Sequence, residues 1–226
     1  MEILQALSPN YSIGRKGRNI VAIVNHKTAG RFPGCLTWLC NPVAQASAHY
    51  LITRRGVIYQ LVQDEDRAWQ AGIVNQPDWS LYDGTNPNSY TIGIEHEDYD
   101  EDGEESLTEI QYQASLWLHK KLIEKWGIPI DRDHIIGHYR IDSVNRPNCP
   151  GPNFPWERLF NNLKGGDIMI PDGARTCVIE VGDKSFPGYV LGATSYFQEG
   201  VGVREVVEAL NRKISWDTNN FKAVIK

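Results

Sequence analysis

The sequence has no long apolar run and no excess of positive charge. None of its hydrophobic stretches approaches the roughly 18–20 residues that span a bilayer, so we expect no membrane insertion. The formal net charge is −5, and because surfaces that bind DNA or RNA are basic, we expect no nucleic acid partner. Residues 1–7 lack the basic start and long apolar region of a secretory signal. We therefore expect synthesis in the cytoplasm.

Cysteine is also scarce, because four in 226 residues are too few for a disulfide framework in a chain of this length. Cys35 and Cys40 could pair in an oxidising compartment, but buried free thiols are the favoured interpretation. Cys177 stands in an apolar run and is assigned to a core. The rest of the composition, with 41% hydrophobic residues and seven tryptophans, is typical of a globular protein. The length allows one sizeable core and a small second domain.

Apolar periodicity predicts an α/β protein. Runs rich in β-branched and aromatic residues predict strands at 20–26, 49–53, 57–62, 90–95 and 134–138. A helix is predicted over 109–126, ended by Gly127, and a closing helical segment over 154–160. His119 falls on the polar side of the long helix, where we expect it to be solvated. The polar stretch 63–90 is too long for a simple connection and predicts a functional loop.

A histidine and a cysteine, His138 and Cys149, stand eleven positions apart on either side of a polar, loop-like segment. Imidazole and thiolate are good zinc ligands, and a catalytic zinc site uses three protein ligands and leaves one position for water. The third ligand must come from elsewhere. His26 is the best candidate, because it ends the strand predicted at 20–26 and precedes a sharp turn at 27–30.

Three more residues are candidates for the same site. Glu95 ends an apolar strand, and a buried carboxylate needs a partner or a task, which favours catalysis over a surface charge. His49 is either a histidine that lines the site or a fourth zinc ligand, and the need for an open coordination position favours lining. Trp69 is either a wall of a substrate groove or core beneath the long loop.

Five short motifs occur in order along the chain. They are residues 24–30 (VNHKTAG), 47–52 (SAHYLI), 68–72 (AWQAG), 92–95 (IGIE), and His138 followed by 149–151 (CPG). Together they resemble the type 2 N-acetylmuramoyl-L-alanine amidases, zinc enzymes of the peptidoglycan-recognition-protein fold that include phage endolysins and bacterial autolysins. The resemblance covers roughly residues 15–160. Each motif alone is weak, and their common order identifies the family.

The resemblance implies a mixed central β-sheet flanked by helices, with a zinc site at one edge of a groove that binds peptidoglycan. It assigns Zn²⁺ to His26, His138 and Cys149, the general base to Glu95, and substrate contacts to Thr28, His49 and Trp69. Family members carry a lysine two residues before the last ligand, where this chain has Pro147. Arg146 is the nearest substitute, and its charge can stabilise an oxyanion.

The densest charge in the chain lies at residues 97–105. From Asp98 to Glu109 the spacing matches a calcium-binding loop of the EF-hand type. A strand rather than a helix precedes this segment, and Ser106 to Glu109 also matches a capping box that begins the next helix. A solvated acidic loop is therefore the favoured interpretation, and calcium binding is the alternative.

Residues 161–167, polar with paired glycines, predict a linker between a catalytic domain, 1–164, and a small α+β domain, 165–226. In the second domain, strands are predicted at 168–170, 176–181 and 188–191. A helix is predicted at 203–210, and a closing hairpin at 214–217 and 221–225. This pattern is similar to the small N-terminal domain of copper amine oxidases. Cell-wall targeting and self-association are both open roles for it.

These observations lead to one interpretation, a zinc amidase that cuts between N-acetylmuramic acid and L-alanine in peptidoglycan. A lytic domain without a secretion signal favours a phage or prophage endolysin or a bacterial autolysin, released to the wall through a holin or by lysis. A cytoplasmic recycling enzyme also fits. The alternative class is a non-catalytic peptidoglycan-binding module of the same fold, which the presence of Glu95 and Cys149 disfavours. A zinc peptidase is disfavoured because the sequence contains no His-Glu-x-x-His motif.

Overall fold

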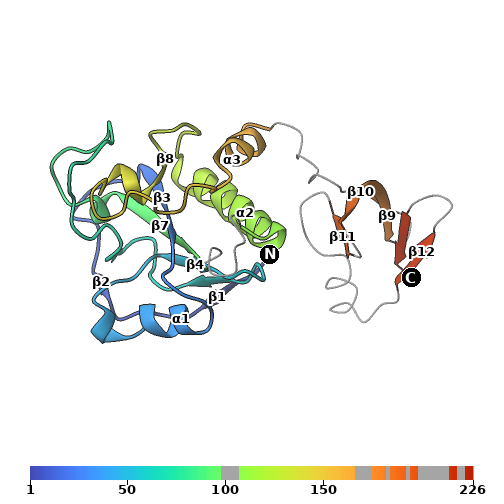
Figure 1. Ribbon diagram of the computed structural model, residues 1–226, viewed down its shortest axis with the longest axis horizontal. Helices are drawn as coiled ribbons and strands as arrows, with labels where there is room; N and C mark the ends of the chain where they lie inside the picture. The colour runs from blue at the N-terminus through green and yellow to red at the C-terminus, as the bar shows by residue number, and fades with distance from the viewer. Residues whose placement is uncertain are drawn as a thin grey trace. The chain divides into compact units, whose positions relative to one another are not determined.

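The computed structural model describes residues 1–97 and 107–165, together with five strands in the remainder of the chain. The chain divides into two compact units, Met1–Lys164 and Gly165–Lys226 (Figure 1). Each unit is described by itself below.

The described residues of the first unit form a central sheet, a two-stranded sheet, three α-helices and three short 3-10 helices. In chain order its elements are β1 (Ile3–Gln5), β2 (Tyr11–Ser12), β3 (Ala22–Lys27), α1 (Gly34–Leu39), η1 (Pro42–Ala44), β4 (Tyr50–Ile52), β5 (Ile58–Gln60), β6 (Arg67–Ala68), η2 (Pro87–Ser89), β7 (Thr91–His96), α2 (Glu109–Trp126), β8 (Ile135–Gly137), η3 (His138–Arg140) and α3 (Trp156–Leu163).

The central sheet has six strands in the order β1-β5-β4-β7-β3-β8. In this sheet only β4 and β5 pair antiparallel, as the hairpin predicted at 49–62, and the other neighbours are parallel. The predicted mixed sheet is thus confirmed. The carboxyl ends of β3, β7 and β8 meet at one edge, where loops rather than further strand continue the chain (Figure 1).

Side chains of the central strands alternate between two faces of the sheet. On one face Ile23, Ile92 and Ile94 pack against the apolar side of α2. On the other face Val24 packs beneath the loop that includes Trp79. His26 lies two residues after Val24, so its side chain is on this second face. Glu95 is on the same face, because it pairs with His26 in the register of β3 and β7. Both functional candidates therefore lie on the face away from α2, covered by loops.

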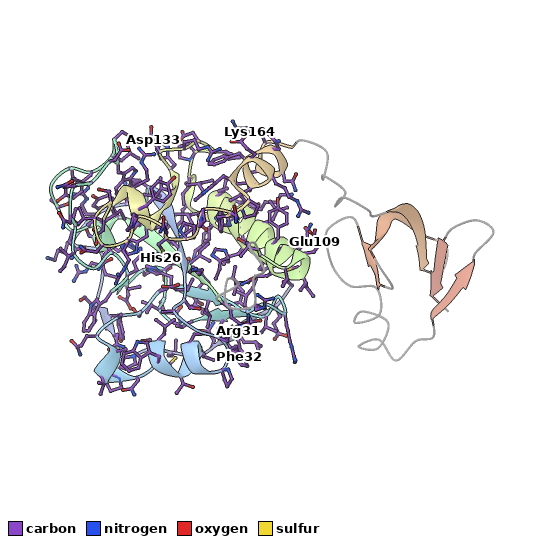
Figure 2. The ribbon with its side chains drawn as sticks, viewed as in Figure 1. His26, Arg31, Phe32, Glu109, Asp133 and Lys164 are labelled. Atoms are coloured by element: carbon purple, nitrogen blue, oxygen red, sulfur yellow. The ribbon has the colours of Figure 1, made fainter. Side chains whose placement is uncertain are left out.

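Helix α2 begins at Glu109, as predicted, but has a different N-cap from the predicted one. Thr108 is the N-cap, and its Oγ1 accepts from the N–H of Gln111 at 3.2 Å. The predicted capping box pairs Glu109 with Ser106, which lies outside the described residues, and the two carboxylate oxygens of Glu109 accept from both Nη atoms of Arg158 at 2.6 and 2.7 Å. Figure 2 shows Glu109 at this helix end. The predicted end at Gly127 is confirmed, with φ of 65° in the left-handed region that favours glycine.

The expectation that His119 is solvated is wrong. Its side chain is fully buried, and its Nδ1 donates to the carbonyl of Ser115 at 2.7 Å. The reason is that α2 is covered on two sides, by the sheet and by α3 with β8, so one amphipathic stripe does not describe its burial. Burial lowers the pKa of His119 to about 4, so the ring is neutral.

Two other expectations concern the acidic loop and the cysteines. Most of the acidic segment, 98–106, lies outside the described residues, so calcium binding stays a prediction. Cys35 and Cys40 are free thiols, and Sγ of Cys40 donates to the carbonyl of Ala6 at 3.3 Å. Within the part of the chain that the structure describes, no helix combines the length and the apolar character needed to cross a membrane.

The second unit forms a five-stranded sheet in the order β11-β10-β9-β13-β12. Its strands are β9 (Arg175–Val181), β10 (Lys184–Leu191), β11 (Thr194–Phe197), β12 (Ile214–Asp217) and β13 (Lys222–Ile225). The predicted closing hairpin is present as the antiparallel pair β12 and β13, while β11 was not predicted. The strand predicted at 168–170 and the helix at 203–210 lie outside the described residues.

Candidate metal centre and active site

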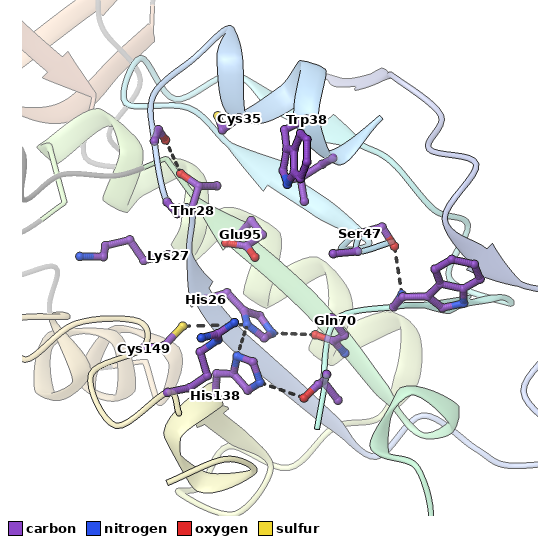
Figure 3. Close-up of a pocket in the computed structure, with 18 of the residues that line it drawn as sticks. His26, Lys27, Thr28, Cys35, Trp38, Ser47, Gln70, Glu95, His138 and Cys149 are labelled. Carbon is purple, nitrogen blue, oxygen red and sulfur yellow. Dashed lines mark hydrogen bonds between the residues drawn. The ribbon is translucent and has the colours of Figure 1, made fainter. Parts of the chain in front are cut away.

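Three side chains from distant parts of the chain meet at the carboxyl edge of the sheet (Figure 3). His26 comes from β3, His138 follows β8, and Cys149 ends the loop after η3. One ligand atom of each residue lies within 4.8 Å of the others. The two Nδ1 atoms are 3.1 Å apart, and Sγ of Cys149 is 4.0 Å from Nδ1 of His26. These are the three residues that the sequence predicts as metal ligands.

The loop 141–149 is folded so that its end returns to its beginning. Oδ1 of Asp142 accepts from the N–H groups of Val144 and Asn145, and the N–H of Cys149 donates to the carbonyl of Arg146. The N–H of Tyr139 then donates to the carbonyl of Cys149 at 3.2 Å. Backbone hydrogen bonds therefore hold the thiol next to the ring of His138.

The remaining hydrogen bonds determine which histidine nitrogens carry protons. Nε2 of His26 lies 2.8 Å from Oε1 of Gln70, and Nε2 of His138 lies 3.0 Å from the carbonyl oxygen of Ala71. Both oxygens only accept, so each Nε2 carries the proton and each Nδ1 presents a lone pair. Burial lowers the pKa of both rings, for His26 with a further contribution from His138, so both are neutral at pH 7.

This arrangement fits a bound cation. Two lone pairs that face each other across 3.1 Å repel, and a metal ion between them and the sulfur removes that repulsion. Two neutral imidazoles and a thiolate are a donor set that zinc prefers. Burial raises the pKa of the Cys149 thiol to about 12, with the charge of Glu95 adding to the shift. Binding of a metal ion at this site would therefore displace a proton from the thiol.

Glu95 lies beside the three ligands, because β3 and β7 pair in a register that places it opposite His26. Its Oε2 is shielded from solvent and has no hydrogen-bond partner among the described residues. Burial raises the pKa of Glu95 to about 8, and the positive charge of Arg146 opposes this shift. A partly buried carboxyl group with a free oxygen, next to a metal-ligand group, is suited to exchange protons near neutral pH.

Two cations accompany the site. Arg146 is exposed, lines the cavity, and uses Nη1 to donate to the carbonyl of Asn145 at 3.2 Å. Its charge opposes the rise in the pKa of both Glu95 and Cys149, so it acts electrostatically on the centre of the site. Lys27 directly follows His26, but Figure 3 shows its side chain directed away from the three ligands.

The site opens into a cavity of about 1210 Å³. Thr28 lines the cavity, and its hydroxyl donates a hydrogen bond to the carbonyl of Gly30 at 2.6 Å. Trp69, in the loop after β6, also lines the cavity, and its indole N–H donates to Oγ of Ser12 at 2.9 Å. Of the two alternatives for Trp69, the structure thus places it in the cavity wall. Trp38 of α1, 54% exposed, is a further aromatic wall that the sequence did not indicate.

The placement of His49 in the substrate site is wrong. Its side chain is fully buried and does not line the cavity. Nδ1 accepts from the N–H of Gly93 at 3.0 Å, and Nε2 lies 2.8 Å from Nη2 of Arg15. His49 directly precedes β4, which β7 separates from β3, so the ring lies away from the strand that carries His26. The local pattern around His49 contained no signal for this separation.

Sequence analysis also missed Gln70 and Gly93 as parts of the site. Both occur there only within the family motifs, Gln70 in 68–72 and Gly93 in 92–95. Their significance depends on the contact between a loop and a strand that are more than 20 residues apart. No periodicity in either segment indicates that contact.

The fold and the ligand group together define a protein of mixed α/β fold with two histidines and a cysteine at the edge of its sheet. The family model described as N-acetylmuramoyl-L-alanine amidase matches residues 16–152, which is more than half of the chain. The chain belongs to this family and is an amidase. The matched residues lie within the first unit and include all three candidate ligands.

Individual relatives agree with this assignment. The chain is 30% identical over 178 residues to N-acetylmuramoyl-L-alanine amidase A of Achromobacter lyticus, covering 71% of this chain and 92% of that one. It is 39% identical over 121 residues to the 1,6-anhydro-N-acetylmuramyl-L-alanine amidase AmpD of Haemophilus influenzae, covering 53% of this chain and 60% of that one. The chain thus spans nearly all of the first relative but less than two thirds of the second.

Solved structures show the same fold. The crystal structure of a selenomethionine AmpD derivative superposes with a TM-score of 0.58 at 30% identity, over 72% of this chain and 94% of that one. The amidase AmiD from E. coli, solved with the substrate anhydro-N-acetylmuramic acid-L-Ala-D-γ-Glu-L-Lys, gives a TM-score of 0.53 at 29% identity. That match covers 69% of this chain and 60% of AmiD.

Proposed function

We propose that this protein uses zinc to hydrolyse the amide bond between N-acetylmuramic acid and L-alanine in peptidoglycan. The observation that carries the proposal is the convergence of His26, His138 and Cys149 beside Glu95 at the floor of one cavity. The names of the relatives support the substrate class, and the substrate solved with AmiD contains this bond.

His26 Nδ1, His138 Nδ1 and Cys149 Sγ would hold the zinc ion. When bound, zinc supplies a water of lowered pKa and a Lewis acid for the scissile carbonyl. Glu95 accepts the proton of the attacking water through its free Oε2 and then delivers it to the nitrogen of the departing alanine. Arg146 lies on the solvent side of the cavity, where its charge stabilises the oxygen that becomes negative.

The cavity walls orient the sugar and the peptide around this centre. Trp38 and Trp69 present aromatic surface to the cavity, and Thr28 contributes a polar edge beside the ligands. A long open cavity is consistent with a polymeric substrate that enters from solvent. His26 and His138, by contrast, are buried and Glu95 is partly buried, so charges at this centre are screened by water less than charges on the surface.

The decisive experiment is digestion of purified peptidoglycan with and without a zinc chelator. New N-terminal alanine and new reducing sugar are followed in parallel. We expect a chelator-sensitive rise in N-terminal alanine with no new reducing ends. If the protein sediments with the wall but releases nothing, it is a recognition module and the catalytic proposal is wrong.

Glu95→Gln provides the matched control for this digestion. The substitution keeps the size of the side chain and removes its basicity, so we expect unchanged zinc content and a turnover lower by about 10²–10⁴-fold. Near-normal release by this variant would remove Glu95 from the mechanism.

For the biological setting, we propose action on the cell wall after synthesis in the cytoplasm, as an endolysin or autolysin. The motif pattern of the catalytic unit supports this setting. We further propose that the second unit, with its resemblance to the N-terminal domain of copper amine oxidases, either targets the enzyme to the wall or mediates self-association. Comparison of intact cell walls with soluble anhydro-muropeptides as substrates tests the setting, because a recycling enzyme prefers the soluble compound.

A further inference from the structure

Gln70 joins the candidate metal centre to a strand that provides no ligand. Its side chain is 7% exposed. Oε1 lies 2.8 Å from Nε2 of His26 (Figure 3). Nε2 of Gln70 donates to Oγ1 of Thr91 at 2.8 Å. The amide therefore bridges β3 and β7 on the face of the sheet that carries the site.

Hydrogen bonding at Thr91 determines which end of the amide faces His26. The Thr91 hydroxyl donates its single proton to the carbonyl of Pro87 at 2.8 Å, so toward Gln70 it can only accept. The group of Gln70 next to Thr91 must then be the NH₂, and the group next to His26 must be the carbonyl oxygen. Since that oxygen only accepts, His26 carries its proton on Nε2 and leaves Nδ1 unprotonated.

Gly93 provides the space for this amide. A Cβ at position 93 would lie 1.8 Å from Oε1 of Gln70 and 2.4 Å from its Cδ, far inside van der Waals contact. A side chain at position 93 and the amide of Gln70 thus exclude each other. Glycine is required here for space, because a larger residue would push the acceptor away from His26.

The same loop also orients the second histidine. Oδ1 of Asn88 accepts from the N–H of Gln70 at 3.3 Å and from the N–H of Ala71 at 2.9 Å. The Ala71 carbonyl in turn accepts from Nε2 of His138 at 3.0 Å. Residues 70 and 71 therefore present one acceptor to each histidine, and both rings turn Nδ1 toward Cys149.

We propose that Gln70, seated in the space left by Gly93, is a positioning residue that selects the Nε2–H tautomer of His26 and so holds Nδ1 ready for a metal ion. The proposal rests on the zinc dependence proposed above and adds a residue that acts through His26 without contacting the metal or the substrate. A residue that only filled space at this position would need no acceptor atom. The tests exploit this difference.

The first test compares Gln70→Met, which keeps the length and loses the acceptor, with Gln70→Glu, which keeps an acceptor oxygen. Gln111→Met is the matched control, because Gln111 is also buried but donates to the carbonyls of Ile52 and Glu97, away from the ligands. Zinc affinity is measured by competition with a chromophoric chelator. We expect Gln70→Met to bind zinc about 10–100-fold more weakly, with Gln70→Glu and Gln111→Met within about threefold of the wild type.

The second test reads the tautomer directly by ¹⁵N NMR of the histidine rings in the metal-free protein. We expect His26 to carry its proton on Nε2 in the wild type and to show a mixture of the two tautomers in Gln70→Met. This measurement separates the two proposals. Absence of zinc binding by the wild type would contradict the proposed function, while the NMR result would still decide the role of Gln70.

A double-variant cycle tests the role of Gly93. Gly93→Ala alone should weaken zinc binding to the same extent as Gln70→Met and should lower stability, because the added methyl collides with the amide. In the Gln70→Ala background the same substitution should cost little further stability, while zinc affinity stays low. The proposal is overturned if Gln70→Met binds zinc like the wild type, if its His26 keeps the Nε2–H tautomer, or if the two substitutions act additively.

Discussion

Glu95 faces opposite demands, because burial favours its neutral form while the proposed chemistry needs its carboxylate. Burial raises its pKa to about 8, and the charge of Arg146 acts in the opposite direction. A metal ion held by His26 and its partners adds a second positive charge and lowers the pKa of Glu95 further. Loading of the ligand group is thus expected to favour the carboxylate at neutral pH, which couples metal binding to the base.

This coupling predicts how the stability of the metal-free protein depends on pH. Between about 4.5 and about 8 the unfolded chain has lost the Glu95 proton and the folded chain retains it, so the folded state becomes less stable as pH rises. We expect a loss of about 1–3 kcal/mol across this interval, absent in Glu95→Gln. Urea unfolding of both proteins at a series of pH values measures the difference. Parallel curves would show that Glu95 titrates near its ordinary pKa.

Cys149 allows a complementary prediction at the same scale. Its thiolate is the only anionic donor of the ligand group, so Cys149→Ala should lose most of the bound zinc, as measured by elemental analysis after gel filtration. The fold should persist, because Cys149 is only half-buried and its backbone makes the contacts to Tyr139 and Arg146. Unchanged zinc content in a folded variant would remove Cys149 from the ligand set.

Single residues differed in how far the sequence could predict them. His26, His138 and Cys149 were predictable as a group because their residue types and flanking motifs are specific to one chemistry. His49 was placed wrongly, because a histidine within a motif can serve the structure and the sequence does not show which strand separates it from the site. Gln70 was not assigned a role, because its function depends on the absence of a side chain at Gly93.

Among the elements, α2 connects the sheet to the rest of the first unit. Its apolar side covers the sheet through Leu118 and Leu122, and its first turn is tied to the turn after β4 by Thr108. Thr108 Oγ1 donates to the carbonyl of Arg54 at 2.6 Å and accepts from Gln111 N–H. One hydroxyl thus caps the helix and fixes its position on the sheet.

Thr108→Ala removes both hydrogen bonds and leaves the N–H of Gln111 without its cap. We expect a loss of about 1–2 kcal/mol in the free energy of unfolding, measured by urea denaturation. Thr108→Ser keeps the hydroxyl and should fall within about 0.5 kcal/mol of the wild type. An equal loss in both variants would show that the methyl group of Thr108, and not its hydroxyl, stabilises this end of α2.

The elements themselves were largely predictable, and the limits of the predictions are physical. Strands β3 and β7 and helix α2 follow from strong apolar patterns, and the structure confirms them within one or two residues. The cap of α2 was misplaced because Ser106 and Thr108 are both good N-cap residues and only the contact with Arg54 distinguishes them. The burial of His119 was missed for a related reason, since α3 covers a second side of the helix.

At the scale of the whole molecule, the catalytic candidates are confined to one unit. All residues assigned to the site lie between His26 and Cys149, within the compact unit Met1–Lys164, which has its own buried clusters. The second unit, Gly165–Lys226, contains a separate five-stranded sheet. A role for this unit in catalysis would require a residue from outside the family match at 16–152.

Removal of the second unit therefore distinguishes a role in catalysis from a role in wall binding or self-association. We expect residues 1–164 to fold, bind zinc, and cleave a soluble muropeptide within about twofold of the full chain, because the site and its supporting contacts remain complete. On intact cell walls, a targeting role predicts slower release of N-terminal alanine and weaker sedimentation with the wall. A role in self-association instead predicts that light scattering finds residues 1–164 in a smaller oligomer than the full chain, with wall binding retained. Loss of activity on the soluble substrate by a folded, zinc-loaded 1–164 would show that the second unit contributes to the site itself.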